Sequence, residues 1–251
     1  MNIQPFISEQ FNGAIWRMEI DELTETVFVE VRDSEEKKVH FGSVSLTNGK
    51  VYFKGLTTPE RWLTGIEAAY DGVLLLHGYQ SESAPAHKGL IAIDALTGKT
   101  LWSNYNFTFD HLSVKGLVVY DSRILPRKLF LTNIKTGATI GTYQSSVYEK
   151  LKSNILLPEL ITGEAVSKFI PMRAFGNMVH YLAYNNFRII SLHTLIDGQL
   201  NQLLFIMDGD KNIYEDLLNN KIQKMQPEAF ILYKSNLIYI KNKSELIVLP
   251  L

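Results

Sequence analysis

The sequence has no cysteine, almost no excess charge of either sign and no long apolar run. Without cysteine there can be no disulfide, thiolate metal site or cysteine nucleophile, so stability must come from burial of apolar side chains. The 25 basic and 26 acidic residues give a net charge of -1, which offers no electrostatic attraction to nucleic acid or to an anionic membrane. No apolar run approaches the roughly 18 residues of a membrane span. We therefore expect neither nucleic acid nor membrane as a partner.

Signals for export and for common cofactors are also missing. The first ten residues, MNIQPFISEQ, lack the basic and apolar segments of a secretory signal, which favours a cytoplasmic location. The chain contains no Gly-x-Gly-x-x-Gly, Gly-x-Ser-x-Gly or Gly-x-x-x-x-Gly-Lys-Ser/Thr, so nucleotide cradles and serine-hydrolase elbows have no support. The sequence thus indicates no cofactor and no catalytic residue.

The most informative segment is Gly89–Trp102, which reads GLIAIDALTGKTLW. Leu90 and Ala92 alternate with Ile91 and Ile93, which is typical of a strand. Thr97 and Gly98 then supply a turn, and a second strand follows that ends on an aromatic residue. The segment therefore predicts a β-hairpin. Similar glycine-centred turns recur along the chain, at Gly13, Gly49, Gly98, Gly137 and Gly198.

This hairpin resembles the L-x-A-x-D-x-x-T-G-K-x-x-W repeat of the quinoprotein-like β-propellers, closely over one hairpin and loosely over several others. The wider stretch Leu74–Gly98 also resembles uncharacterised single-domain bacterial propeller proteins. The resemblance implies a fold and not an activity. Pyrroloquinoline quinone is not expected, because the dehydrogenases that bind it use eight blades, a vicinal disulfide and a calcium site, whereas this chain is too short and has no cysteine.

The recurring turns predict an all-β chain that forms a single β-propeller domain over residues 1–251. Five turns indicate five blades, and the long interval before Gly198 leaves room for a sixth. The apolar segment Glu245–Leu251 and the segment Phe11–Trp16 imitate the same hairpin when they are joined end to end. We therefore expect the N- and C-terminal strands to close one blade, with Ala14–Ile20 as its outer strand.

Aromatic residues and two inserts complete the expected fold. Trp16, Phe53 and Trp102 follow their turns at equivalent places, where an aromatic side chain would pack between adjacent blades. Among the expected strands, Ser167–Met172 would begin the fourth blade. Two segments lose the period-two pattern, residues 145–160 and residues 212–225. The second has apolar residues at helical spacing and ends before Pro227, so we expect a short amphipathic helix there.

One face of such a propeller carries most of the chemically versatile side chains. We expect the ligand or partner there, at a face built around a long loop from His77 to Lys88. Ordinary solvated coil is the alternative for this loop. The residues of this face are Arg61, Trp62, His77, Tyr79, His87, Lys88, Asp110, His111 and Arg127.

Two segments of the sequence partly match metal-binding patterns. His77, His87 and His111 could supply nitrogen ligands to a metal, but their spacing matches no short motif, so no metal is expected. Asp208–Asn212 opens like a calcium loop, yet the later glycine and glutamate positions of that motif hold Ile213 and Asn219, which favours a turn with a helix cap.

The sequence therefore favours a non-enzymatic binding or scaffold module that recognises a protein or peptide partner. A small-molecule site or a hydrolase at the channel mouth is the alternative. In that case Asp110 or Glu67 would act as acid or base, and His77, His87 or Arg127 would position the substrate.

Overall fold

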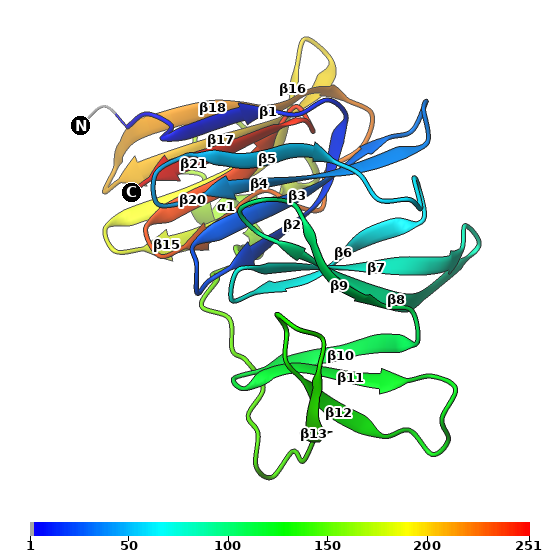
Figure 1. Ribbon diagram of the computed structural model, residues 1–251. Helices are drawn as coiled ribbons and strands as arrows, with labels where there is room; N and C mark the ends of the chain where they lie inside the picture. The colour runs from blue at the N-terminus through cyan, green and yellow to red at the C-terminus, as the bar shows by residue number, and fades with distance from the viewer. Residues whose placement is uncertain (1–2) are drawn as a thin grey trace. The chain divides into compact units, whose positions relative to one another are not determined.

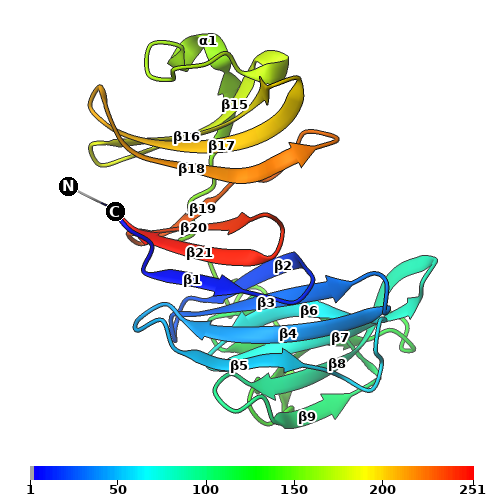
Figure 2. The same ribbon diagram turned by 90° about the horizontal axis from the view of Figure 1, so that it is seen from above.

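The computed structural model describes residues 3–251, which form two compact units of almost entirely β structure. One unit is Asn12–Ser153; the other combines the N-terminal residues up to Phe11 with Asn154–Leu251. Most strands of both units are labelled in Figures 1 and 2. Each unit is described by itself.

The unit Asn12–Ser153 contains three four-stranded antiparallel sheets, and in each of them the strands pair in chain order. The first sheet consists of β2 (Ala14–Asp21), β3 (Thr26–Asp33), β4 (Lys38–Ser45) and β5 (Val51–Leu56). The second consists of β6 (Thr64–Tyr70), β7 (Val73–Ser81), β8 (Ala84–Asp94) and β9 (Thr100–Asn104). The third consists of β10 (Phe107–Ser113), β11 (Gly116–Asp121), β12 (Leu129–Thr132) and β13 (Thr139–Thr142).

The other unit contains a five-stranded and a four-stranded sheet. The larger one pairs, in chain order, β14 (Glu159–Thr162), β15 (Met178–Tyr184), β16 (Phe187–Ile196), β17 (Gln199–Asp208) and β18 (Lys211–Ile222). The smaller one has the order β1-β21-β20-β19, built from β1 (Ile7–Gln10), β19 (Ile231–Tyr233), β20 (Asn236–Lys241) and β21 (Glu245–Pro250). The short helix α1 (Gly163–Val166) and the 3-10 turn η1 (Phe175–Asn177) precede β15.

The expected all-β fold of blade-like sheets is therefore confirmed, with five sheets among the described residues. Closure by the chain termini is also confirmed, since β1 pairs with β21 through Ile7 and Val248. The strand that closes the sheet is nevertheless Ile7–Gln10 and not Ala14–Ile20. Ala14–Asp21 instead pairs with Thr26–Asp33, and Asp21 Oδ1 accepts the Leu23 amide in the tight turn between them. Gly13 consequently lies in a link between sheets and not in a hairpin turn.

Turns between the third and fourth strands share one hydrogen-bond pattern in the first three sheets. The side chains of Ser45, Asp94 and Asn133 each accept the amides two and three residues further on. Each of these residues also accepts, through its backbone carbonyl, the amide of a glycine at 2.9–3.0 Å. Those glycines, such as Gly98 with φ 69°, have the left-handed conformation that only glycine adopts at little cost. The recurring turn predicted from the sequence is thus present.

Successive sheets pack through an aromatic side chain placed on a glycine of the next turn. A Cβ atom added to Gly137 would lie 2.7 Å from Trp102 Cδ2, and one added to Gly98 would lie 3.3 Å from Phe53 Cδ1. The Trp102 indole also donates to the Ile134 carbonyl at 2.7 Å. The predicted role is confirmed for Phe53 and Trp102. It is wrong for Trp16, which is 69% exposed because it lies in a first strand and not in a fourth.

The middle sheet of this unit is apolar on both faces. On β7, Leu74 and Leu76 pack against the first sheet, whereas Val73 and Leu75 pack against the third. Burial on both faces explains why this strand reads as an uninterrupted apolar run.

The second predicted insert is not helical. Residues 211–222 form β18, in which the consecutive Leu217 and Leu218 pack on opposite faces of the sheet. Shifts in the β17–β18 register break the alternation, and the remaining apolar spacing imitates that of a helix. The Asp208–Asn212 segment is accordingly a hairpin turn.

Two further expectations concern the segment around α1. The first insert, residues 145–160, is irregular until β14 begins at Glu159. The expected strand Ser167–Met172 is absent from the described residues, because Val166, Ile170 and Ala174 are buried together at a spacing of four along a short helix and the turns after it. Over residues 3–251, no helix is long and apolar enough to cross a membrane.

Truncation of Trp102 should cost far more stability than truncation of Trp16. Trp102→Ala removes both the glycine contact and the indole hydrogen bond, and we expect a loss of roughly 3–5 kcal/mol in the free energy of unfolding. Trp16→Ala should cost less than about 1 kcal/mol, because most of that side chain is in solvent. Urea unfolding of both variants provides the comparison. Equal losses would contradict the packing described.

The stability of the protein should fall in acid through His193 on β16. Burial lowers the pKa of His193 to about 4, and its Nε2 accepts the Gln226 amide at 2.9 Å. Between about pH 6.5 and 4 the unfolded chain binds the proton and the folded chain does not, so this contribution decreases as the pH falls. The stability advantage of the wild type over His193→Asn should shrink by about 2–3 kcal/mol over this range. The free energies of unfolding of both proteins are measured by chemical unfolding at several pH values. A difference between them that does not change with pH would contradict this role of His193.

Candidate functional site

The segment His77–Lys88 is an extended β-hairpin and not a long loop. Strand β7 continues to Ser81 and β8 begins at Ala84, with His87 opposite Tyr79 and Leu90 opposite His77. Pairing between β7 and β8 continues through this segment. The polar composition of the segment gave no sign of these strands. The predicted site residues of this segment are therefore held on a sheet.

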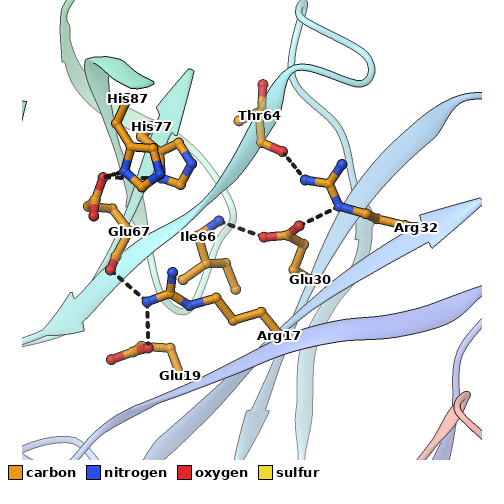
Figure 3. Close-up of polar contacts among 9 residues, drawn as sticks. All are labelled: Arg17, Glu19, Glu30, Arg32, Thr64, Ile66, Glu67, His77 and His87. Carbon is orange, nitrogen blue, oxygen red and sulfur yellow. Dashed lines mark hydrogen bonds and ion pairs between the residues drawn. The ribbon is translucent and has the colours of Figure 1, made fainter. Parts of the chain in front are cut away.

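Two histidines of this hairpin converge on one carboxylate, as Figure 3 shows. Glu67 Oε2 lies 2.8 Å from His87 Nδ1 and 3.1 Å from His77 Nδ1. The imidazole rings are stacked, with centroids 3.5 Å apart and planes 8° from parallel. The ring of Tyr79 meets both histidines edge-on. We call Glu67, His77 and His87 the His–Glu cluster.

A β-bulge brings Glu67 to this position. On β6, Ile66 pairs with Leu76 and Ala68 pairs with Leu75, so Glu67 is an extra residue without a partner on β7. Bulges redirect a side chain and are common next to functional sites. Trp16 on β2 and Asp110 on β10 occupy the same kind of bulge in the first strands of their sheets.

Burial and mutual contact set the charges of the His–Glu cluster. Burial raises the pKa of Glu67, but the contacts with His77 and His87 outweigh it and leave this pKa below its ordinary value. Burial lowers the pKa of His77, more than the neighbouring carboxylate raises it. At neutral pH the cluster therefore contains an ionised carboxylate and a neutral His77 imidazole. These are the forms in which both groups bind metals.

Two ion pairs of the first sheet lie beside the cluster, and each pair is also hydrogen-bonded to the backbone of the second sheet, as Figure 3 shows. Arg32 Nε donates to Glu30 Oε1 at 2.7 Å, and Glu30 Oε2 accepts the Ile66 amide at 2.8 Å. The Arg17 guanidinium contacts Glu19 at 3.3 Å and donates to the Glu67 backbone carbonyl at 3.1 Å. Burial raises the pKa of Glu19 despite this contact with Arg17.

Arg32 also organises a group of aromatic rings. Its guanidinium carbon lies 4.9 Å from the centroid of Trp62, 5.8 Å from Trp16 and 5.9 Å from Tyr79. It further donates to the Thr64 carbonyl at 3.1 Å. Of the three rings, Trp16 is largely exposed and the other two are half-buried.

A second group of predicted residues assembles on the third sheet. Asp110 accepts from Arg127 at 2.5 Å, and its other oxygen lies 2.9 Å from His111 Nδ1. The Arg127 guanidinium lies 3.5 Å from the centroid of the Tyr120 ring. The expected pairing of Asp110 with His111 is therefore present. His111 belongs to this group, so the trio of His77, His87 and His111 considered for a metal does not form.

The other predicted residues have simpler surroundings. Arg61 and Lys88 are exposed, and the Arg61 carbonyl accepts the Val39 amide at 2.7 Å. Sequence reasoning missed Arg17, Glu19, Glu30 and Arg32. The sequence did contain a signal for these ion pairs. Arg17 and Glu19 are two residues apart, as are Glu30 and Arg32, so the members of each pair lie on the same face of a strand.

Comparison with known proteins gives little information on function. A model of a domain of unknown function, DUF4905, matches residues 20–102, which is less than half of the chain. No curated protein matches.

Two solved structures align over most of the chain. One is the β-propeller domain of the Trilobed protease from Pyrococcus furiosus, with 8% identity, coverage of 95% of this chain and 71% of the other, and a TM-score of 0.29. The second is described as a glucose dehydrogenase, with 11% identity, coverage of 96% and 83%, and a TM-score of 0.24. These TM-scores are low, so the fold is assigned from the strand pairing of this chain.

The two histidines of the cluster should differ in their importance for folding. His77 is 1% exposed, so His77→Ala leaves a buried void and we expect a loss of about 2–3 kcal/mol in the free energy of unfolding. The His87 side chain is 34% exposed, and His87→Ala should cost less than about 1 kcal/mol. Chemical unfolding of both variants checks this difference, and a larger loss for His87→Ala would contradict it.

Proposed function

We propose that this chain is a non-enzymatic binding module that recognises a protein or peptide partner through an aromatic face. The face consists of Trp16, Trp62, Tyr79 and His87, with Arg61 and Lys88 as its exposed basic residues. The observation that carries the proposal is Trp16, which keeps 69% of its surface in solvent at a bulge of strand β2. Tryptophan is among the residues that contribute most to protein interfaces.

The rings of this face are fixed before any partner arrives. Arg32 contacts all three aromatic rings, and its guanidinium is bonded to Glu30 and to the Thr64 carbonyl. A face that is already ordered loses little conformational entropy on binding, which favours affinity. We infer that the partner inserts an apolar side chain against Trp16.

The hydrolase alternative fits the surroundings of the carboxylates less well. A hydrolytic pair needs one carboxyl group that can donate a proton. Glu67 is held ionised by the two imidazoles, and Asp110 is paired with Arg127 and with His111. A binding role requires neither group to change its protonation state.

We also propose that the repeat is of the quinoprotein-like type, as the sequence resemblance implies. The contact of Trp102 with Gly137 and the bonds from Asp94 to the amides of Leu96 and Thr97 support this assignment. The cytoplasmic location stays a prediction.

Selection of peptides on the full-length chain tests the binding proposal. A display library of random peptides is selected on the wild-type protein, and the affinity of the enriched peptides is measured by fluorescence anisotropy. Because a tryptophan at the centre of an interface contributes on the order of 2 kcal/mol, Trp16→Ala should weaken binding by roughly tenfold or more.

Tyr105→Ala is the matched control, since Tyr105 is 72% exposed and lies outside the aromatic face. It should leave the affinity unchanged. Failure to enrich any peptide, or peptides that bind Trp16→Ala as tightly as the wild type, would refute the proposal.

A further inference from the structure

The His77 imidazole is buried without a hydrogen bond to either of its nitrogens. The residue is 1% exposed, and both Nδ1 and Nε2 lack a hydrogen-bond partner among the described residues. Its Nδ1 is 3.1 Å from Glu67 Oε2, but the contact does not have the geometry of a hydrogen bond. Buried polar atoms in native proteins are nearly always paired, so this unpaired ring calls for an explanation.

The ring is held in this place by its surroundings. A Cβ atom added to Gly65 would lie 3.1 Å from both Cε1 and Nε2 of His77, so glycine makes room for the imidazole edge. One face of the ring stacks on His87, with 3.5 Å between the ring centroids. Its Nδ1 therefore faces the carboxylate of Glu67, as does Nδ1 of His87.

The ligand atoms of the His–Glu cluster have the spacing of a metal site. One oxygen and two nitrogens, from three different strands, all lie within 4.8 Å of one another. Around a tetrahedral zinc ion with bonds of about 2.0–2.1 Å, neighbouring ligand atoms are about 3.3 Å apart. The two contacts of Glu67 Oε2, at 2.8 and 3.1 Å, are slightly shorter than this. Because an imidazole nitrogen binds a metal in the plane of its ring, the two stacked rings must also tilt apart to point both Nδ1 atoms at one ion.

The carboxylate of Glu67 is available for such an ion. Arg17 bonds the backbone carbonyl of Glu67 and the side chain of Glu19, and Arg32 bonds Glu30. The negative charge of Glu67 is thus directed toward the imidazoles and not taken up by these two guanidinium groups.

We propose that Glu67, His77 and His87 form a binding site for one divalent transition-metal ion, of which Zn²⁺ is the best match. Glu67 Oε2 and the two Nδ1 atoms supply the ligands. Two imidazole nitrogens and one carboxylate oxygen suit zinc, whereas calcium and magnesium prefer oxygen ligands alone. The side chain of His87 is 34% exposed, so the site opens to solvent beside this residue and a water molecule or an external ligand can take the fourth position.

This site does not depend on the proposed partner. His87 belongs both to this site and to the aromatic face, whereas Glu67 and His77 are largely buried and belong to the site alone. Peptide binding and metal binding are measured separately, and Trp16→Ala should leave metal affinity unchanged.

Titration of the metal-free full-length chain, without a polyhistidine tag, tests the proposal. The protein is treated with a chelator, and Zn²⁺ is titrated in competition with a chromogenic chelator. We expect one ion per chain. Glu67→Gln and His87→Ala should each weaken binding by roughly tenfold or more, since each removes a direct ligand. Bound Co²⁺ should give the visible absorption of a four-coordinate site with nitrogen ligands.

His180→Ala is the matched control, because His180 is a half-buried histidine outside the cluster, and the affinity of this variant for Zn²⁺ should equal that of the wild type. Circular dichroism shows that each variant is folded before its affinity is compared. Absence of saturable binding below about 100 μM Zn²⁺ would overturn the proposal, and so would unchanged affinity in folded Glu67→Gln and His87→Ala. The contacts of Glu67 with His77 and His87 would then serve only to connect the three strands.

Discussion

Burial of both faces of a sheet is the constraint on which the rest of this structure depends. In the unit Asn12–Ser153, alternate residues of β7 fill two separate cores, Leu74 and Leu76 on one side and Val73 and Leu75 on the other. Such a sheet is stable only between two neighbours, because either apolar face alone would be open to water. Glycines at the turns let the aromatic rings of the previous sheet approach closely, as Trp102 does at Gly137.

Glu30 shows how a charged group is accommodated in this packing. Glu30 is 1% exposed, and its two carboxylate oxygens are bonded to Arg32 and to the Ile66 amide, which ties the first sheet to the second. A buried charge without such bonds would be strongly destabilising. His77 departs from this arrangement, since it is equally buried, neither ring nitrogen makes a hydrogen bond, and Nδ1 has only the 3.1 Å contact with Glu67 Oε2. Functional sites are the places where such departures are expected.

Bulges in the first strands redirect single side chains out of the regular packing. Trp16, Glu67 and Asp110 each stand at a position without a cross-strand partner, so their side chains leave the regular alternation of the sheet. The aromatic face and the His–Glu cluster both depend on such a residue. Because the strands around them remain paired, these side chains leave the alternation without disturbing the core.

Features that depend on local chemistry could be predicted from the sequence. Alternation of apolar residues and the turns at Gly49, Gly98 and Gly137 were enough to predict the all-β sheets, and the polar side chains of His77–Lys88 were the basis for choosing the candidate site. Prediction from the sequence failed at residues 212–225, where bulges and burial on both faces imitate helical spacing, and at His77–Lys88, where cross-strand pairing turns a polar segment into strands. Only the tertiary structure decided which terminal strand pairs with β21. It also decided that His77 meets Glu67 and not His111, because contacts between strands far apart in the chain depend on register and on bulges, which leave no local pattern.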